Sequence, residues 1–254
     1  LPAFAHLPMM LSPQGEKLSK RHAAVSVSEY RDRGYTPEGV LNYLVRFGWS
    51  YGDQEIFSRQ ELIEKFSWDR VNKSDGKFDA AKFADVAFEH LKRPELTDDE
   101  RYLDEVVPFL AQAGIEDPPR DRLRQALPLI RERARDLADA AHHLDFYFRE
   151  PPRMDEKAVK KFLVPDAAPH LEALADAYAA LGEWDANSLQ GCLEGYLQQK
   201  ELPMKAVAQP VRVALSGRTA SPGLFEVMAV LGRDLTLTRL RRGAALARGA
   251  GSAA

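Results

Sequence analysis

The sequence predicts a mainly α-helical protein, and three observations support that fold class. Helix-start signals recur along the chain, apolar residues return every three or four positions, and sustained alternation of apolar and polar residues is nearly absent. The two best candidates for short strands are residues 25–30 and the stretch around Ile56. With 254 residues, of which 45% are apolar and 29% charged, the chain is long enough for one or two globular domains.

Each expected helix start has a recognisable capping pattern. A small polar residue that can accept a hydrogen bond from the first turn is followed, in most cases, by proline or, three residues later, by glutamate. The starts are Thr36-Pro37, Ser58-x-x-Glu61, Asp79, Thr97-x-x-Glu100 and Ser221-Pro222. Apolar stripes follow them, and further stripes run through residues 123–148, 171–178 and 189–197. In the first of these stripes, Pro128 is expected to kink or break the helix.

Composition excludes several classes of protein. No apolar run approaches the roughly 18 residues of a membrane span, and no charged start with an apolar core suggests a signal peptide. The single Cys192 rules out an internal disulfide, and no Cys/His cluster has zinc spacing. We therefore expect a cytoplasmic protein without a metal site or a membrane contact. Because the chain opens on Leu1 without a cap or turn, we expect it to start inside a larger protein.

Positive charge is concentrated in two segments, although the net charge of −3 argues against a protein that coats nucleic acid indiscriminately. Six arginines and two acids lie between Arg120 and Arg135, and five arginines and one acid lie between Arg233 and Arg248. Arginine suits bidentate contacts to phosphate and guanine. On charge alone, a solvated helix face explains these segments equally well.

Residues 13–22, PQGEKLSKRH, form the segment most suited to chemistry. Four side chains within six positions are cationic or can become so: Lys17, Lys20, Arg21 and His22. They repel one another unless a polyanion binds, and a triphosphate is a suitable one, because fixed cations stabilise charge that develops on phosphate. Gly15 is expected to let the loop swing on binding.

This segment resembles the KMSKS signature of class I aminoacyl-tRNA synthetases, in the KLSKRH form typical of glutamyl enzymes. The text around it, FAHLPMMLSPQGEKLSKRH and SVSEYRDRGYTPEGVLNYLVRFGWS, is similar to bacterial-type glutamyl-tRNA synthetases in order and spacing, and so is QPVRVALSGRTASPGLFEVMAVLG at 209–232. The resemblance implies that Lys17 and Lys20 contact ATP and pyrophosphate, with Arg21 beside them. It also implies that Ser19 holds the shape of the loop. ATP and Mg are the implied cofactors of the parent enzyme.

The resemblance also implies a division of the chain into parts with different roles. The family's nucleotide fold lies upstream, so this chain alone is expected to bind no cofactor and to form no glutamyl adenylate. The implied parts are the loop and the end of the catalytic domain (1–23), a helical stem-contact domain with little strand (24–95), two sub-bundles of an all-α anticodon-binding domain (96–150 and 151–247), and a frayed tail (248–254).

Two regions are implied to contact the anticodon arm of tRNA. In the first, a helix over 127–137, Arg131 and Arg135 are expected to share one face, and the family's base-discriminating arginine aligns with Arg133. The second region supplies four expected contacts: Arg212, Ser221, Pro222 and Leu224. Here Ser221 is expected to cap a helix whose positive end favours phosphate, and the Pro222–Leu224 edge to stack on a base, while Phe225 packs in the core. The three tryptophans are expected to be packing residues.

The implied partners are tRNA(Glu), with tRNA(Gln) as a further open alternative, and, in the full-length enzyme, glutamate and ATP; a monomer is expected. Two alternatives from other classes stay open. One is a naturally separate tRNA-binding module, and the other is a helical interaction scaffold without an RNA role.

Overall fold

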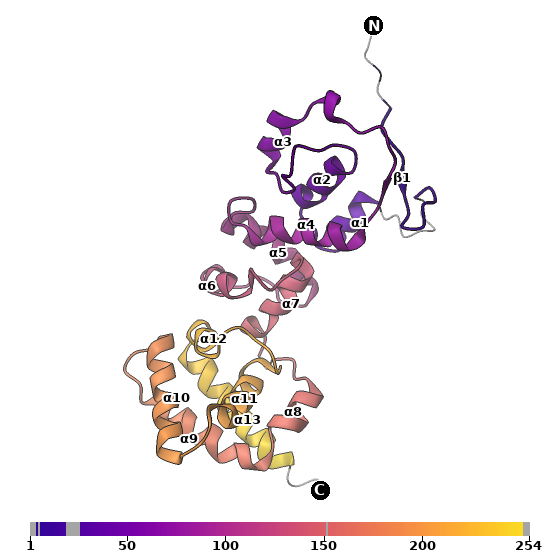
Figure 1. The fold of residues 1–254 in the computed structure, drawn as a ribbon. Coiled ribbons are helices and arrows are strands. Elements are labelled where there is room, and N and C mark those ends of the chain that lie inside the picture. Colours follow the sequence, from indigo (N-terminus) through magenta and orange to yellow (C-terminus); the bar gives the residue numbers. More distant parts are fainter. Residues whose placement is uncertain (1–3, 5, 19–25, 151, 251–254) are drawn as a thin grey trace. The chain divides into compact units, whose positions relative to one another are not determined.

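The computed structural model describes residues 4, 6–18, 26–150 and 152–250, and it confirms the mainly α-helical class (Figure 1). The helices are α1 (Val27–Asp32), α2 (Pro37–Arg46), α3 (Arg59–Lys65), α4 (Ala80–Lys92), α5 (Asp99–Gln112), α6 (Arg120–Ile130), α7 (Leu137–Phe148), α8 (Glu156–Phe162), α9 (Ala168–Ala179), α10 (Ala186–Lys200), α11 (Met204–Ser216), α12 (Leu224–Leu231) and α13 (Arg233–Ala250). Short 3-10 turns lie at Trp68–Arg70 and Pro165–Ala167. The two short strands are β1 (Met10–Leu11) and β2 (Gly76–Lys77).

The chain divides into two compact units. Unit 1 consists of Leu1–Phe109 with Arg131–Ala141, and unit 2 consists of Leu110–Ile130 with His142–Ala254. The division expected from the resemblance follows functional parts of the family rather than packing, and it stays a prediction.

Three of the expected helix starts are confirmed. Thr36 accepts a hydrogen bond from the backbone of Gly39 and precedes Pro37 at the first position of α2. A reciprocal capping box between Ser58 and Glu61 opens α3. The Asp79 carboxylate accepts from Ala81 N and Lys82 N in the first turn of α4. In each case a local side-chain acceptor satisfies backbone donors that no helical carbonyl can reach.

Both expected strands are wrong, for different reasons. At 25–30 the described residues form α1, because Ser26 and Glu29 make a capping box that outweighs the short apolar–polar alternation. The stretch around Ile56 forms no strand and has no partner strand among the described residues. Instead, the side-chain amide of Asn42 donates to Glu55 O at 2.9 Å and accepts from Phe57 N at 2.7 Å, and so substitutes for one.

Two further boundaries differ from expectation. The cap of α5 is Asp98 rather than Thr97: the Asp98 carboxylate accepts from Arg101 N at 3.0 Å, whereas the Thr97 side chain is fully buried. Pro128 does not break its helix, since α6 continues to Ile130. A separate helix, α7, then starts after Asp136, which lies just after the arginine-rich run and accepts from Asp139 N at 2.8 Å.

The core of unit 1 is rich in aromatic side chains. Tyr43 and Phe83 pack edge to face in a cluster with Val40 and Val86, and this cluster joins α2 to α4. The Tyr43 hydroxyl donates to Asp79 O at 3.0 Å and accepts from Asp79 N at 2.8 Å. These two bonds fix the end of β2 to the helical core.

The core of unit 2 is built around α13, which packs against α9 and α11. Buried apolar side chains of these helices, among them Leu171, Leu174 and Leu240, fill the interface. Gly243 allows α13 to approach α11 closely, because a Cβ at that position would lie 2.6 Å from the Cβ of Ala214.

Candidate nucleic-acid interface

Lys17 lies on the returning arm of a tight hairpin that begins with β1. Ser12 N donates to Glu16 O at 2.7 Å, and Gly15 N donates to Ser12 O at 2.9 Å. Gly15 has a φ of +90°, a conformation that favours glycine in a tight turn. Its role in the described structure is therefore to shape a bonded turn, and the expected swing is not needed to explain it. The side chain of Lys17 is exposed.

Three other predicted loop residues, Ser19, Lys20 and Arg21, lie outside the described residues. Their roles stay predictions.

The base of this hairpin is fastened to a segment more than sixty residues away. Met9 N donates to the carboxylate of Asp75 at 2.7 Å, and β1 pairs in parallel with β2, with Met10 opposite Gly76. A Cβ at Gly76 would lie 2.9 Å from the ring of Phe47, so glycine allows this approach. The sequence does not signal β2, because a two-residue strand has no periodicity to detect.

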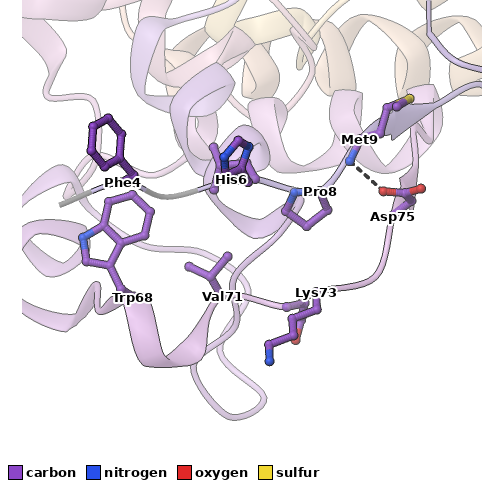
Figure 2. Close-up of a pocket in the computed structure, with 10 residues that line it drawn as sticks. Phe4, His6, Pro8, Met9, Trp68, Val71, Lys73 and Asp75 are labelled. Carbon is purple, nitrogen blue, oxygen red and sulfur yellow. Dashed lines mark hydrogen bonds between the residues drawn. The ribbon is translucent and has the colours of Figure 1, made fainter.

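Beside the hairpin lies an open cavity of about 870 Å³ (Figure 2). Phe4, His6, Pro8 and Trp68 line it, and Figure 2 shows the Met9–Asp75 hydrogen bond at its edge. Trp68 is 62% exposed, so the expectation that it is a packing residue is wrong. The expectation holds for the buried Trp49 and for the half-buried Trp184, whose indole N–H donates to Met228 O.

The three arginines predicted at the first anticodon region lie in three different environments. The predicted helix over 127–137 is wrong beyond Ile130, so the expected common face of Arg131 and Arg135 does not exist. Arg131 is 6% exposed, and its guanidinium donates to Leu91 O and Thr97 O and pairs with Asp99 at 2.7 Å. Its donors bind within unit 1, which disfavours a base contact.

Arg135 and Arg133 are both exposed. Arg135 pairs with Asp85 at 2.6 Å and lies over the ring of Phe88. For Arg133, the structure of the described residues records no hydrogen bond or ion pair. Arg133 is therefore the arginine of this segment whose guanidinium can bind an external acceptor without first breaking an internal contact.

The second predicted region is a turn between α11 and α12, and two of its expected roles are wrong. Gly223 precedes α12 as its N-cap residue without a side-chain cap, so Ser221 does not cap a helix. Pro222 and Leu224 are buried, and Phe225 is only half-buried, so the exposed stacking edge is absent and the expected core position falls on Leu224. Two residues, Pro222 and Gly223, separate Ser221 from the start of α12, so Leu224 rather than Phe225 takes the buried position.

Arg212 holds this turn together. Its guanidinium donates to Pro222 O at 2.8 Å and to the hydroxyl of Ser221. Arg218, which the sequence analysis missed, ties the same turn to α7: it pairs with Asp145 at 2.7 Å and donates to His142 O. Its only sequence signal is a charged residue just after Gly217, whose φ of +75° ends α11.

The arginines of α13 bind within unit 2. Arg239 is fully buried and bonds to Glu150 and to two backbone carbonyls. The partners of the other four are as follows: Arg233 with Ala179 O, Arg241 with Asp176, Arg242 with Glu150 and Arg248 with Glu172. The arginines of this segment are therefore paired within unit 2. This favours the alternative of a solvated, salt-bridged helix face over an RNA-binding face.

No helix within the described ranges is long and apolar enough to cross a membrane. Among those same residues, no group of three or more His, Cys, Asp or Glu side chains could hold a metal ion.

Comparison with known proteins agrees with this arrangement. Residues 1–85 match the family described as tRNA synthetases class I (E and Q), catalytic domain, and residues 101–244 match the anticodon binding domain family. The chain is 42% identical over 243 residues to glutamate–tRNA ligase 1 of Syntrophus aciditrophicus, covering 95% of this chain and 51% of that protein. It is 41% identical to the glutamate–tRNA ligase of Geobacter sulfurreducens, covering 96% and 52%.

A crystal structure of a glutamate tRNA ligase from Elizabethkingia meningosepticum superimposes with a TM-score of 0.82 at 28% identity, over 96% of this chain and 52% of that one. The chain thus spans about half the length of the relatives it matches. A catalytic-domain segment followed by a helical anticodon-binding domain is the arrangement of a class I aminoacyl-tRNA synthetase. Within that class, the chain belongs to the glutamyl-tRNA synthetase family.

Proposed function

We propose that this chain is the tRNA-binding part of a cytoplasmic glutamate–tRNA ligase, which activates glutamate with ATP and transfers it to tRNA(Glu). The observation that carries the proposal is the anticodon-binding domain match over residues 101–244, which includes an exposed, internally unengaged arginine at 133. Residues 24–95 then contact the tRNA stem, and 96–150 and 151–247 form the two sub-bundles of the anticodon-binding domain.

In this proposal Arg133 discriminates between the anticodons of tRNA(Glu) and tRNA(Gln). A guanidinium donates two parallel hydrogen bonds to an accepting base edge, and a mismatched base leaves those donors desolvated and unpaired. Arg212 acts differently, because its donors hold the backbone at Ser221 and Pro222. It shapes the turn that faces the RNA and does not select the base.

In the loop, Lys17 and Lys20 neutralise phosphate charge as pyrophosphate leaves, with Arg21 beside them and Ser19 holding the loop shape. Lys20 carries most of the adenylation effect: Lys20→Ala in the full-length enzyme should slow adenylation by roughly two to three orders of magnitude, the scale of one electrostatic contact in the transition state. The described residues do not fit a bound Mg²⁺ ion, since no acidic cluster is present among them, so no step is assigned to a metal held by this chain.

A binding titration of the chain with unmodified tRNA(Glu) at several salt concentrations tests the proposal. We expect saturable binding that weakens linearly in log–log form as salt rises, because contacts to phosphates release counterions. Binding at the level of an unrelated helical protein of equal charge would favour the interaction-scaffold alternative.

The chain alone should form no glutamyl adenylate. The lysines of the loop need an ATP site, and we expect that site in the half of the relatives' length that this chain does not span. The measurement is glutamate-dependent exchange of pyrophosphate into ATP. Exchange above background with the purified chain contradicts this part of the proposal.

A further inference from the structure

Three backbone segments lie side by side at the hairpin. Leu11 pairs in parallel with Lys77 of β2 and, on its other edge, forms an antiparallel bridge with Lys17. Residues that are paired directly across neighbouring strands project their side chains from the same face. Lys77, Leu11 and Lys17 therefore share one face of this small sheet, although sixty residues separate the two lysines in the sequence.

The side chain of Lys77 extends across this face toward the hairpin turn. A Cβ at Gly15 would lie 3.9 Å from the Cε atom of Lys77, so the end of the lysine lies over the turn from which Lys17 emerges. Lys77 is also held firmly at its backbone. Phe78 N donates to Leu11 O at 2.8 Å, and the following Asp79 is bonded to Tyr43 through both its N–H and its carbonyl.

Lys77 forms no ion pair with the described residues around it. It lines a small cavity together with two other cations, Arg46 and Lys82, and one acid, Asp79, whose carboxylate caps α4. Both of those cations pair with Glu55, Arg46 at 3.1 Å and Lys82 at 2.7 Å. No ion pair is recorded within the described ranges for Lys77 or for Lys17, and both side chains are exposed.

We propose that Lys77 is a second phosphate-binding residue, which contacts the same anion as Lys17. This inference rests on the proposed function, in which Lys17 contacts phosphate. Two ammonium groups on one face repel each other, and a phosphate group that accepts hydrogen bonds from both relieves that repulsion. The shared chemistry is a phosphate oxyanion, supplied either by a nucleoside triphosphate or by the RNA backbone.

The test uses the 254-residue chain and four single variants, with inorganic tripolyphosphate as the first probe and unmodified tRNA(Glu) as the second. Lys17→Gln and Lys77→Gln remove the two charges, Lys77→Arg retains charge, and Lys73→Gln removes an exposed lysine four residues before Lys77. Thermal melts check that each variant is folded. We expect Lys77→Gln to weaken tripolyphosphate binding about two- to fivefold, as for an exposed ionic contact. Lys77→Arg and Lys73→Gln should bind like the parent.

The combined Lys17→Gln/Lys77→Gln variant should lose less than the product of the two single losses, because both lysines bind one anion. If tripolyphosphate binding is unchanged but Lys77→Gln lowers the salt dependence of tRNA binding by about one counterion, the anion is the RNA backbone, and the inference stands. A Lys77→Gln variant that matches Lys73→Gln with both probes overturns the inference. Loss at Lys17 alone removes the phosphate role of Lys77 and leaves that of Lys17 intact. Loss at neither lysine overturns the phosphate role of both, while the tRNA titration of the parent chain still decides the proposed tRNA-binding function.

Discussion

The arginines at 131–135 and those of α13 lie in contrasting surroundings. On the connection between α6 and α7, one arginine is buried, one is paired with an acid at the surface and one, Arg133, has no internal partner in the described structure. Along α13, all five arginines bond to acids or carbonyls of unit 2. The difference teaches that partner placement, and not the number of arginines, decides whether such a segment can bind RNA.

The largest expected effect comes from the buried arginine of α13. Arg239→Met should lower the free energy of unfolding by about 3–5 kcal/mol, because the carbonyls of Leu215 and Arg149 lose their donor and Glu150 keeps only Arg242 as a partner. Chemical denaturation of the chain measures it. A loss below about 1 kcal/mol would break the comparison, since Arg239 would then be no more anchored than a surface residue.

Acid should lower the stability of unit 1 through His90. Unit 1, which contains Arg131, should therefore respond to pH through this residue, whereas unit 2, which contains Arg239, should not. His90 is 1% exposed, and burial lowers its pKa from 6.5 to about 4, with Arg93 and Arg101 acting in the same direction and Glu38 opposing them. The fold prefers the neutral ring, so its stability is fully present above about pH 6.5 and falls as pH drops toward 4. The maximum loss is about 3 kcal/mol.

His90→Gln keeps a side-chain N–H that can bond to Asn42, the present partner of the ring at 3.0 Å, but does not titrate. Denaturation curves between pH 4 and pH 7 should be flatter for this variant than for the parent. Equal slopes would mean that His90 does not couple folding to pH.

Arg133→Gln should narrow the preference for tRNA(Glu) over tRNA(Gln) by up to about 1–3 kcal/mol, because glutamine lacks the charge and the two-pronged donor. Dissociation constants of both tRNAs for the chain provide the measurement. Stability should stay within about 0.5 kcal/mol of the parent, as for other free surface residues. Arg131→Met should do the reverse, lowering stability while leaving the tRNA preference unchanged.

Parallel weakening of both tRNAs by Arg133→Gln would make Arg133 a phosphate contact. The search for the discriminating residue would then move to Arg135, since the donors of Arg131 are bound to Leu91, Thr97 and Asp99.

The smallest effect is expected for Arg241, one of the exposed arginines of α13. Arg241 is 59% exposed and lies 3.6 Å from Asp176, so Arg241→Ala should change stability by at most about 1 kcal/mol and leave tRNA binding unchanged. Denaturation of the variant and its titration with tRNA(Glu) measure these two properties. A clear loss of tRNA affinity would show that α13 has an RNA-facing side after all.

Local chemistry let the sequence by itself determine the helical class and the starts at Thr36, Ser58 and Asp79, whereas the family came from the resemblance of whole segments. A cap or an apolar stripe acts within one or two helical turns, so its residues are neighbours in the sequence. The errors at Ser26 and Asp136 have another cause. Each cap is local and visible in the sequence, but the prediction followed a more conspicuous pattern of alternation or charge instead.

Tertiary structure alone decided which side chains face a partner. Arg131 is an interior residue because Leu91 and Thr97 present free carbonyls to it, and Leu224 is buried because α12 begins three residues after Ser221. Lys77 reaches the hairpin of Lys17 only because β1 and β2 pair across more than sixty residues. Such contacts depend on where distant segments meet, and no local pattern of residues specifies that meeting.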